Sequence, residues 1–257
     1  MKYKNKTWIY PLMIMGFGLI LIASCNKNEE SSKATLLPST KNIVFNNNLS
    51  FGTLTDVDGN VYKTIVIAKN TIHEQTWMAE NLKVTHYRNG DPIPNITEAT
   101  SWQNITTAAY CDYNNTPAYS SVYGRLYNLY AIVDSRLICP LGWHIPSDTE
   151  WNVLTTNMGG QAMAGQNMKE IGLDHWQAPL DTAVKDTSGF TALPGGFRNG
   201  HDGSFNLPGY YGYWWSSTKN SSCDYFYRSV GSSTKEVYRI GGFTGNGFSV
   251  RCIKDSI

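Results

Sequence analysis

One stretch constrains the fold more than any other: residues 189–218 read GFTALPGGFRNGHDGSFNLPGYYGYWWSST. Glycines and aromatic rings are interleaved through it more densely than elsewhere in the chain. Glycine adopts backbone conformations closed to other residues and lets segments approach closely. Tyr and Trp carry large amphipathic surfaces with one hydrogen-bonding tip. Strands from residue 189 onward must therefore be short, and the rings must form either the centre of a core or a contact surface.

The first residues have the features of an export signal. Three lysines form a basic start, an apolar run extends over residues 8–22, and small residues precede Cys25. The apolar run is about 15 residues long, shorter than the ~20 that a membrane-spanning helix needs. Residues 1–24 are therefore predicted to be a secretory signal peptide.

The end of this signal has the sequence Ile22-Ala23-Ser24-Cys25. It resembles the lipobox of bacterial lipoproteins, in which a peptidase cuts before the cysteine and acyl chains are then attached. We expect Cys25 to be lipidated, because more than one acyl chain makes anchoring stable. The alternative is an uncleaved membrane anchor with an incidental cysteine.

Residues 25–50 are polar and poor in aromatic side chains, as in a flexible tether. The sequence Lys27-Asn28-Glu29-Glu30 is similar to tags that send some lipoproteins to the outer face of the outer membrane, although it is also ordinary tether composition. These features predict a protein of the bacterial outer membrane that is lipid-anchored and exposed at the cell surface.

The mature chain is slightly acidic. Removal of the signal lowers the number of basic residues from 21 to 18 against 20 acidic ones, a net charge of about −2. Nucleic-acid binding needs a basic footprint, so nucleic acid is not an expected partner. The roughly 205 residues after the tether can bury a core as one domain, predicted at 51–257.

The cysteines indicate disulfides. Besides Cys25 the chain has Cys111, Cys139, Cys223 and Cys252, and an even number in an exported protein favours pairing. Four cysteines allow three connectivities. We favour Cys139–Cys252, which would tie the middle of the domain to its last strand, together with Cys111–Cys223.

Strand patterns lie at both ends of the domain. Residues 61–67 alternate and are β-branched after a turn signal at Asp58-Gly59, and residues 75–82 indicate a strand that runs into a bend. A calcium loop opened by Asp56 is the alternative, but Val61 and Ile67 stand where that loop needs Gly and Glu. Further strands are predicted at 224–230, 237–240 and 248–253.

Helix signals are concentrated in the middle of the chain. Ser147 and Glu150 form a capping box for a helix over about 148–157, which Gly159-Gly160 would end. Apolar residues in 124–133 recur at helical spacing, and 161–171 is a further candidate. Residues 88–121 show little periodicity and are expected to be loops with at most one short helical turn.

Seven motifs occur in order along the chain: DVDGNVYKTIVI, QTWMAENLK, YGRLYNLYA, CPLGWHIPSDTEW, LPGGFRNG, YWWSST and GFSVRCIKD. Together they resemble the Fibrobacter succinogenes major paralogous domain family of bacterial exported and lipid-anchored proteins. That family is similar in turn to C-type-lectin-like folds and formylglycine-generating enzymes. The resemblance implies an α+β, loop-rich, C-type-lectin-like domain with short twisted antiparallel strands and two or three short helices. Some members belong to bacteria that adhere to plant fibre, which implies adhesion.

No reaction is indicated by the residues. Formylglycine-generating enzymes bind copper through two nearby cysteines close to the C-terminus, whereas Cys223 and Cys252 are far apart in sequence. There is no G-x-S-x-G elbow, and the histidines lack metal-ligand spacing. His144 is expected to be a hydrogen-bonded structural residue. We therefore expect a protein that is not an enzyme and has no cofactor.

Binding remains, and the aromatic residues are the candidates. Seven of them could stack on sugar rings: Tyr210, Tyr211, Tyr213, Trp214, Trp215, Tyr225 and Tyr227. Arg198, Asn199 and Asp202 could supply hydrogen bonds, as placed polar groups do in ligand sites. A core location is favoured for Trp214 and Trp215, because large aromatic residues dominate burial in small irregular domains. Adjacent strand residues face opposite sides, so one of the two is expected in the core and the other could be exposed. Arg251 is expected to bind carbonyls or a carboxylate.

These observations predict a non-catalytic binding or adhesion module for a glycan or an envelope protein. The predicted ligand residues are Arg198, Asn199, Asp202, Tyr210, Tyr211 and Trp215. The alternatives are a structural or assembly component of the envelope and, less favoured, a formylglycine-generating-type enzyme. A calcium ion held by loop carboxylates such as Asp112, Asp202 and Asp224 is a further possibility.

Overall fold

The structure is a computed structural model that describes residues 38–172, 174–178, 184–220 and 224–256. The predicted signal peptide, Cys25 and most of the tether lie outside the described residues, as does Cys223. In the described ranges, no helix has the length and apolar character needed to cross a membrane.

The described residues form one unit that combines two larger and two smaller antiparallel sheets with short helices. The five-stranded sheet has the order β1 (Gly52–Thr55), β2 (Val61–Ile67), β3 (Gln75–Met78), β12 (Ile253–Lys254) and β6 (Trp143–His144). The three-stranded sheet has the order β11 (Val237–Phe243), β10 (Asp224–Gly231) and β9 (Tyr211–Lys219). The two-stranded sheets are β4 (Tyr110–Cys111) with β5 (Leu126–Tyr127) and β7 (Phe197–Arg198) with β8 (Phe205–Asn206).

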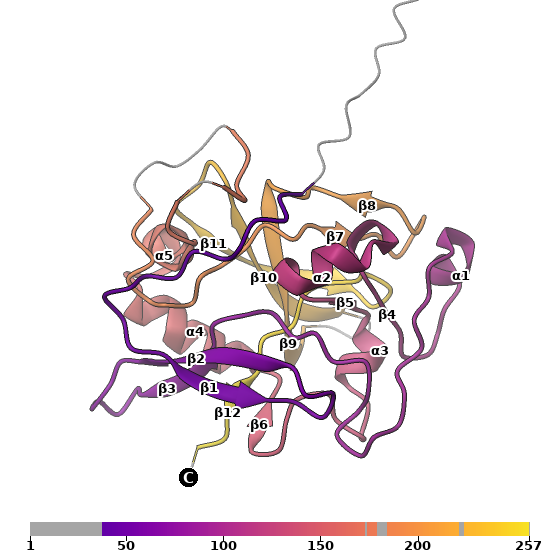
Figure 1. The fold of residues 1–257 in the computed structure, drawn as a ribbon, viewed down its shortest axis with the longest axis horizontal. Coiled ribbons are helices and arrows are strands. Elements are labelled where there is room, and N and C mark those ends of the chain that lie inside the picture. The colour runs from indigo at the N-terminus through magenta and orange to yellow at the C-terminus, as the bar shows by residue number, and fades with distance from the viewer. Residues whose placement is uncertain (1–37, 173, 179–183, 221–223, 257) are drawn as a thin grey trace, which may run out of the picture. The chain divides into compact units, whose positions relative to one another are not determined.

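The helices are α1 (Ala99–Gln103), α2 (Pro117–Tyr123), α3 (Leu129–Ile132), α4 (Asp148–Asn157) and α5 (Gln161–Met168), with a 3-10 turn at Tyr113–Asn115. Helices α4 and α5 lie next to each other and against the three-stranded sheet (Figure 1). The predicted α+β class with short antiparallel strands is confirmed, although the helices outnumber the two or three that were expected.

Local signals placed α4 correctly. The Ser147 hydroxyl accepts a hydrogen bond from the Glu150 amide at 3.2 Å, and the Glu150 carboxylate accepts one from the Ser147 amide at 2.7 Å. This capping box satisfies donors that the first helical turn leaves free. Gly159 and Gly160 have positive φ angles and end the helix, as predicted. The hairpin at Asp58-Gly59 is also confirmed, since Gly59 has φ +82° between β1 and β2.

Local predictions were wrong at four places. Of the strand predicted at 248–253, only Ile253 belongs to a strand, β12, because Phe248 and Ser249 form isolated bridges. The strands expected to be short after residue 189 include β9 and β10, which have 9 and 8 residues.

Residues 124–133 do not form one helix: Leu126–Tyr127 is strand β5, and α3 is a single turn behind it. Gly124 has φ +70°, and a Cβ there would lie 2.6 Å from the Asn81 side chain, so the chain must turn before β5. Residues 88–121 contain two helices rather than one turn, and Pro117 begins α2 at a position where its missing amide costs nothing.

A buried arginine connects the last segment to the rest of the core. Arg251 is fully buried, and its Nε donates to Asn81 Oδ1 at 2.8 Å. Its Nη2 donates to the Thr191 carbonyl at 2.9 Å, and Nη1 donates to the Phe190 carbonyl. The predicted carbonyl-binding role of Arg251 is therefore confirmed. Burial lowers the pKa of this guanidinium to about 9.

The folded part begins before the predicted boundary at residue 50. The Val44 amide donates to Glu170 Oε1 at 2.6 Å, and the Asn46 side chain donates to the Asp186 carbonyl at 3.2 Å. The Lys41 carbonyl lies 3.1 Å from Nε2 of the fully buried His175. Residues 38–50 therefore do not behave as tether, because their polar groups satisfy buried polar groups of the domain.

One of the two predicted disulfides is confirmed. Cys139 and Cys252 are bonded and tie residues that are 113 apart in sequence. The pairing of Cys111 with Cys223 is wrong, because Cys111 is a free and fully buried thiol. It lies on β4 in an apolar cluster with Tyr113 and Leu126. Burial raises the pKa of the Cys111 thiol to about 12, so it stays neutral and unreactive.

We expect the double variant Cys139→Ala/Cys252→Ala to lose about 2–4 kcal/mol of unfolding free energy in urea, because closing a long loop restricts the unfolded chain. Alkylation of denatured but unreduced protein should label Cys111 and spare Cys139 and Cys252. Labelling of Cys252 before reduction would contradict this pairing. Native protein serves as the control, because its buried Cys111 should not be alkylated.

Candidate functional site

The three-stranded sheet carries most of the predicted ligand residues, and its two faces differ. In its register Tyr213 lies opposite Ser229 and Trp215 lies opposite Tyr227. Directly opposed residues share a face and neighbours along a strand alternate. Trp214 and Arg228 are paired in the same register and therefore belong to the other face.

Trp214 and Trp215 are both fully buried, so the favoured core location is confirmed and the expectation that one could be exposed was wrong. Trp214 packs on Phe190 with ring centroids 5.6 Å apart. Trp215 packs on Phe248 at 4.5 Å and donates from Nε1 to the Tyr127 carbonyl at 2.8 Å. Each face of β9 is covered at this point by another segment, so Trp215 is part of the core and not a ligand residue.

Arg198 is also structural rather than ligand-binding. It is fully buried and donates to the carbonyls of Ile96, Thr97 and Gly203 at 2.5–3.0 Å. Its guanidinium lies 4.5 Å from the centroid of the Trp102 ring. A buried guanidinium with all its partners in the protein is not available to a ligand.

Asn199 and Asp202 belong to a turn that closes on itself. The Asn199 side chain accepts from the His201 amide at 2.8 Å, and Asp202 Oδ1 accepts from the Ser204 amide at 2.9 Å and from its hydroxyl at 2.6 Å. Asp202 is exposed, and Gly203 has φ +70°. Ser204 lowers the pKa of the Asp202 carboxyl by hydrogen bonding. The side-chain oxygens of Asn199 and Asp202 are therefore used to stabilise the turn itself.

Four half-exposed tyrosines lie on one face of the sheet, and three of them are in contact. We call them the tyrosine row: Tyr211, Tyr213, Tyr225 and Tyr227. Tyr211 stacks on Tyr213 at 5.9 Å with an interplanar angle of 30°, and Tyr213 lies 5.9 Å from Tyr227. Ile240, which pairs with Tyr227, is 42% exposed and extends the apolar surface onto β11.

Phe248 packs against two residues of the tyrosine row and restricts their side chains. Phe248 stacks on Tyr213 at 5.3 Å with an angle of 14° and packs on Tyr227 at 4.7 Å. Burial raises the pKa of Tyr213 and Tyr227, so the hydroxyls stay protonated and can both donate and accept hydrogen bonds. Tyr210, the other predicted tyrosine, is half-buried beside Tyr211. The sequence contained these rings but did not show which of them share a face.

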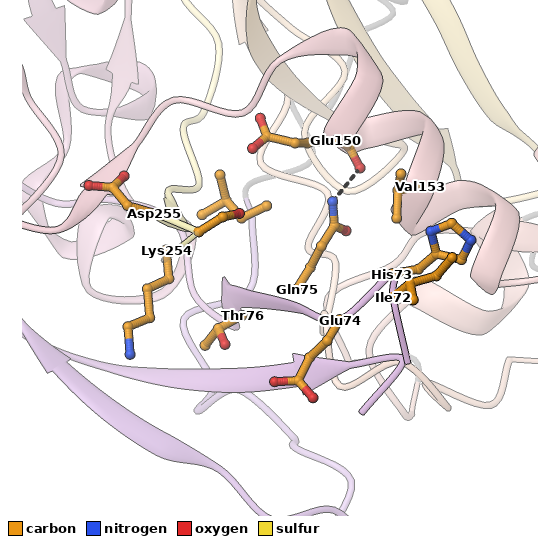
Figure 2. A pocket seen from close by; sticks show the side chains of 11 residues that line it. Ile72, His73, Glu74, Gln75, Thr76, Glu150, Val153, Lys254 and Asp255 are labelled. Carbon is orange, nitrogen blue, oxygen red and sulfur yellow. Dashed lines mark hydrogen bonds between the residues drawn. The ribbon is translucent and has the colours of Figure 1, made fainter. Parts of the chain in front are cut away.

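A second concave site lies between α4 and strands β3 and β12 of the five-stranded sheet. Its volume is about 430 Å³, and Figure 2 shows its lining: Ile72, His73, Glu74, Gln75, Thr76, Glu150, Val153, Ile253, Lys254, Asp255 and Ser256. The Gln75 side chain donates to the Glu150 carbonyl at 3.2 Å across it. The Glu74 carboxylate accepts from the Asn70 amide at 2.7 Å.

His144 lies between the carboxylates of Glu150 and Asp255, two residues that line this groove. Its Nε2 lies 2.9 Å from Glu150 Oε1, and its Nδ1 lies 2.6 Å from Asp255 Oδ1. The hydrogen bond to Glu150 and then the one to Asp255 raise the pKa of His144 to about 9 against the effect of burial. The ring is therefore a cation at neutral pH that joins α4 to the C-terminal residues, in agreement with its predicted structural role. A protonated ring cannot act as a general base.

The predicted calcium carboxylates do not gather around one point. Across the described part of the chain, no group of three or more His, Cys, Asp or Glu side chains is placed to hold a metal ion. Asp112 instead pairs with Arg125 at 3.3 Å and accepts from the Ser120 hydroxyl. Asp56 satisfies the turn amides of Asp58 and Asn60 at 2.9 Å, which confirms the hairpin over the calcium-loop alternative.

The sequence profile of the Fibrobacter succinogenes major domain matches residues 71–254. The chain belongs to this family. No curated protein and no solved structure matches it. The match begins just before β3 and ends at β12, so the Fibrobacter succinogenes major domain includes the tyrosine row and most of the groove. The lectin-like fold stays a prediction.

The contacts of His144 with Glu150 and Asp255, which we call the His144 latch, predict how the stability of the domain depends on pH. The folded-state pKa of His144 lies above its usual value of 6.5, so the latch stabilises the fold fully below pH 6.5 and is lost as pH rises towards 9. We expect the wild type to lose about 1 kcal/mol more unfolding free energy between pH 6 and 9.5 than His144→Gln, a value reduced for solvent screening of a half-exposed pair. Urea unfolding at both pH values measures it, and equal pH dependence in both proteins would contradict the latch.

Proposed function

We propose that this protein is a non-catalytic binding module of the bacterial cell envelope that adheres to polysaccharide through the tyrosine row. The observation that carries the proposal is the row itself: four half-exposed tyrosines on one sheet face, of which Tyr213 and Tyr227 pack on Phe248. Rigid aromatic surfaces with polar tips bind at low entropic cost, because few torsions must be fixed.

The geometry of the row suits a chain of sugar rings. Tyr211, Tyr213 and Tyr227 follow one another at 5.9 Å intervals across β9 and β10, so that neighbouring rings can contact one extended ligand. The protonated hydroxyls of Tyr213 and Tyr227 offer hydrogen bonds beside their apolar faces. A polymer needs such a repeated, open surface rather than a deep cavity, and the row is a surface of that kind.

The proposed location follows from the N-terminal sequence. The signal peptide, the lipobox cysteine Cys25 and a tether that ends before residue 38 would anchor the domain in the outer membrane and display it at the cell surface. The acidic balance of the mature chain supports a partner other than nucleic acid.

A non-catalytic role is supported by the way the titratable groups are used. The two groove carboxylates Glu150 and Asp255 both bind His144, and Cys252 is in a disulfide rather than in a copper pair. The second candidate function is a structural component of an envelope assembly. The complete burial of Trp214 and Trp215 favours it, because the most aromatic part of the chain then builds the scaffold.

We expect Tyr225→Ala and Tyr227→Ala to weaken polysaccharide binding by about fivefold each, since an aromatic contact contributes roughly 1 kcal/mol beyond its buried area. The measurement is affinity electrophoresis on a panel of cellulose, xylan, mannan, pectin and peptidoglycan. Tyr225→Phe keeps the ring and should retain most of the affinity.

The matched control is Phe51→Ala, which removes a half-buried ring that packs on Phe45 near β1. It should leave binding unchanged. Loss of binding in Phe51→Ala, or no binding of wild type to any polysaccharide together with a stable complex on native purification, would favour the assembly role instead.

The anchor is tested separately. Cells grown with an alkyne-tagged palmitate should incorporate the label into the wild-type protein, and Cys25→Ser should abolish incorporation and release the protein from the membrane fraction. Equal labelling of both proteins would show that Cys25 is not the acylated residue.

A further inference from the structure

The face of the three-stranded sheet opposite the tyrosine row carries two arginines that share one carboxylate. Arg228 on β10 and Arg239 on β11 are paired in register. Asp148, the first residue of α4, accepts from Arg228 Nη2 at 2.8 Å through Oδ1. The same carboxylate accepts from Arg239 Nε at 2.8 Å and from Arg239 Nη2 at 3.0 Å. Two cations and one anion leave an uncompensated positive charge.

A cavity of about 200 Å³ opens beside this pair, between the helices and the sheet. It is lined by Asn152, Thr155, Thr156, Gln161, Arg228, Val237 and Arg239. Among these described lining residues there is no acidic side chain, while two guanidiniums, two hydroxyls and two amides are present. The lining is therefore rich in donors and carries net positive charge.

One guanidinium donor of Arg228 is unpaired in the described part of the chain. Arg228 is 1% exposed, and its Nη1 is buried with no hydrogen-bond partner among the described residues. Its Nη2 is occupied by Asp148 and by Asn152 Oδ1 at 2.8 Å. A buried guanidinium N–H left unpaired costs free energy that a bound acceptor would recover. Arg239 lies 3.6 Å from the Phe226 ring and keeps its place beside the cavity.

Comparison with Arg136 shows what is unusual about the Arg228–Arg239 pair. Arg136 also binds one aspartate through Nε and Nη2, at 2.9 and 2.8 Å to Asp134, and lies 4.0 Å from an aromatic ring, that of Tyr87. Asp91 gives it a second carboxylate at 3.2 Å. The geometry of Arg136 matches that of Arg239, but its charge is over-compensated, whereas the Arg228–Arg239 pair lacks one anion.

We propose that this cavity is a binding site for one small oxyanion, a carboxylate, sulfate or phosphate group, held by Arg228 and Arg239 with Thr156 and Gln161 completing the shell. Guanidiniums suit such groups because their planar N–H pairs match two oxygens. The site lies on the opposite face from the tyrosine row, so it is independent of the polysaccharide proposal.

The test is a titration of the mature protein with sodium sulfate, phosphate and acetate at constant ionic strength, followed by the amide NMR signals of Asn152, Thr155 and Thr156. Saturable shifts are expected for the wild type. Arg239→Gln should weaken the apparent affinity at least tenfold, and the matched control Arg136→Gln should leave it unchanged. A parallel titration compares glucuronate with glucose, which lacks the carboxylate. Binding of glucuronate alone would indicate that the physiological ligand is a sugar carboxylate rather than an inorganic ion.

A second pair of variants tests the missing charge without removing an arginine. Thr156→Glu places a carboxylate at the cavity, and Thr156→Gln has the same shape without charge. Thr156→Glu should raise the melting temperature above that of Thr156→Gln and abolish the sulfate-induced shifts. Non-saturable shifts in the wild type, equal affinity in Arg239→Gln, or a lower melting temperature for Thr156→Glu than for Thr156→Gln would each overturn the site.

Discussion

The fold depends on the fully buried guanidinium of Arg251. A cation in a protein core is tolerated when its donors are satisfied, and here four acceptors come from Asn81, Met78, Phe190 and Thr191. Asn81 Oδ1 also accepts from Trp214 Nε1 at 2.8 Å. One polar node therefore joins the last segment, the turn after β3, strand β9 and the loop around residue 190. The neighbouring Cys252 reinforces it covalently through Cys139, so the end of the chain closes the domain.

This closure gives the three-stranded sheet its two faces. On one face Phe248, three residues before Arg251, supports the tyrosine row and leaves its outer edges exposed. On the other face, Trp214 and the arginine pair meet Phe190 and α4. A single short sheet thus presents an aromatic surface on one side and a cationic cavity on the other, since side chains alternate along each strand. The two proposed sites have different ligand chemistry for this reason.

Sequence reasoning worked where the signal was local or covalent. The capping box of α4, the Asp58-Gly59 hairpin and the Cys139–Cys252 bond each depend on few residues with strong preferences. It was wrong at 124–133, where helical spacing of apolar residues was overridden by the positive φ of Gly124 and by pairing with β4. For the candidate site it identified the aromatic residues but misplaced Trp215 and Arg198, because burial depends on segments more than 30 residues away in sequence, Phe248 and Ile96 among them.

Residues 189–218 show which properties the sequence determined and which the tertiary structure decided. Their glycines and rings by themselves determined close approaches and a choice between core and contact surface: at Gly200 a Cβ would lie 2.4 Å from the backbone of Gly245. The short strands expected here are present as β7 and β8, whereas β9 extends over nine residues. The choice between the two was made by tertiary structure. Trp214 and Trp215 became core because another segment covers each side of β9, while Tyr211 and Tyr213 kept an exposed edge. Which side of a strand is covered is a property of the segments that pack on it, and these lie elsewhere in the chain.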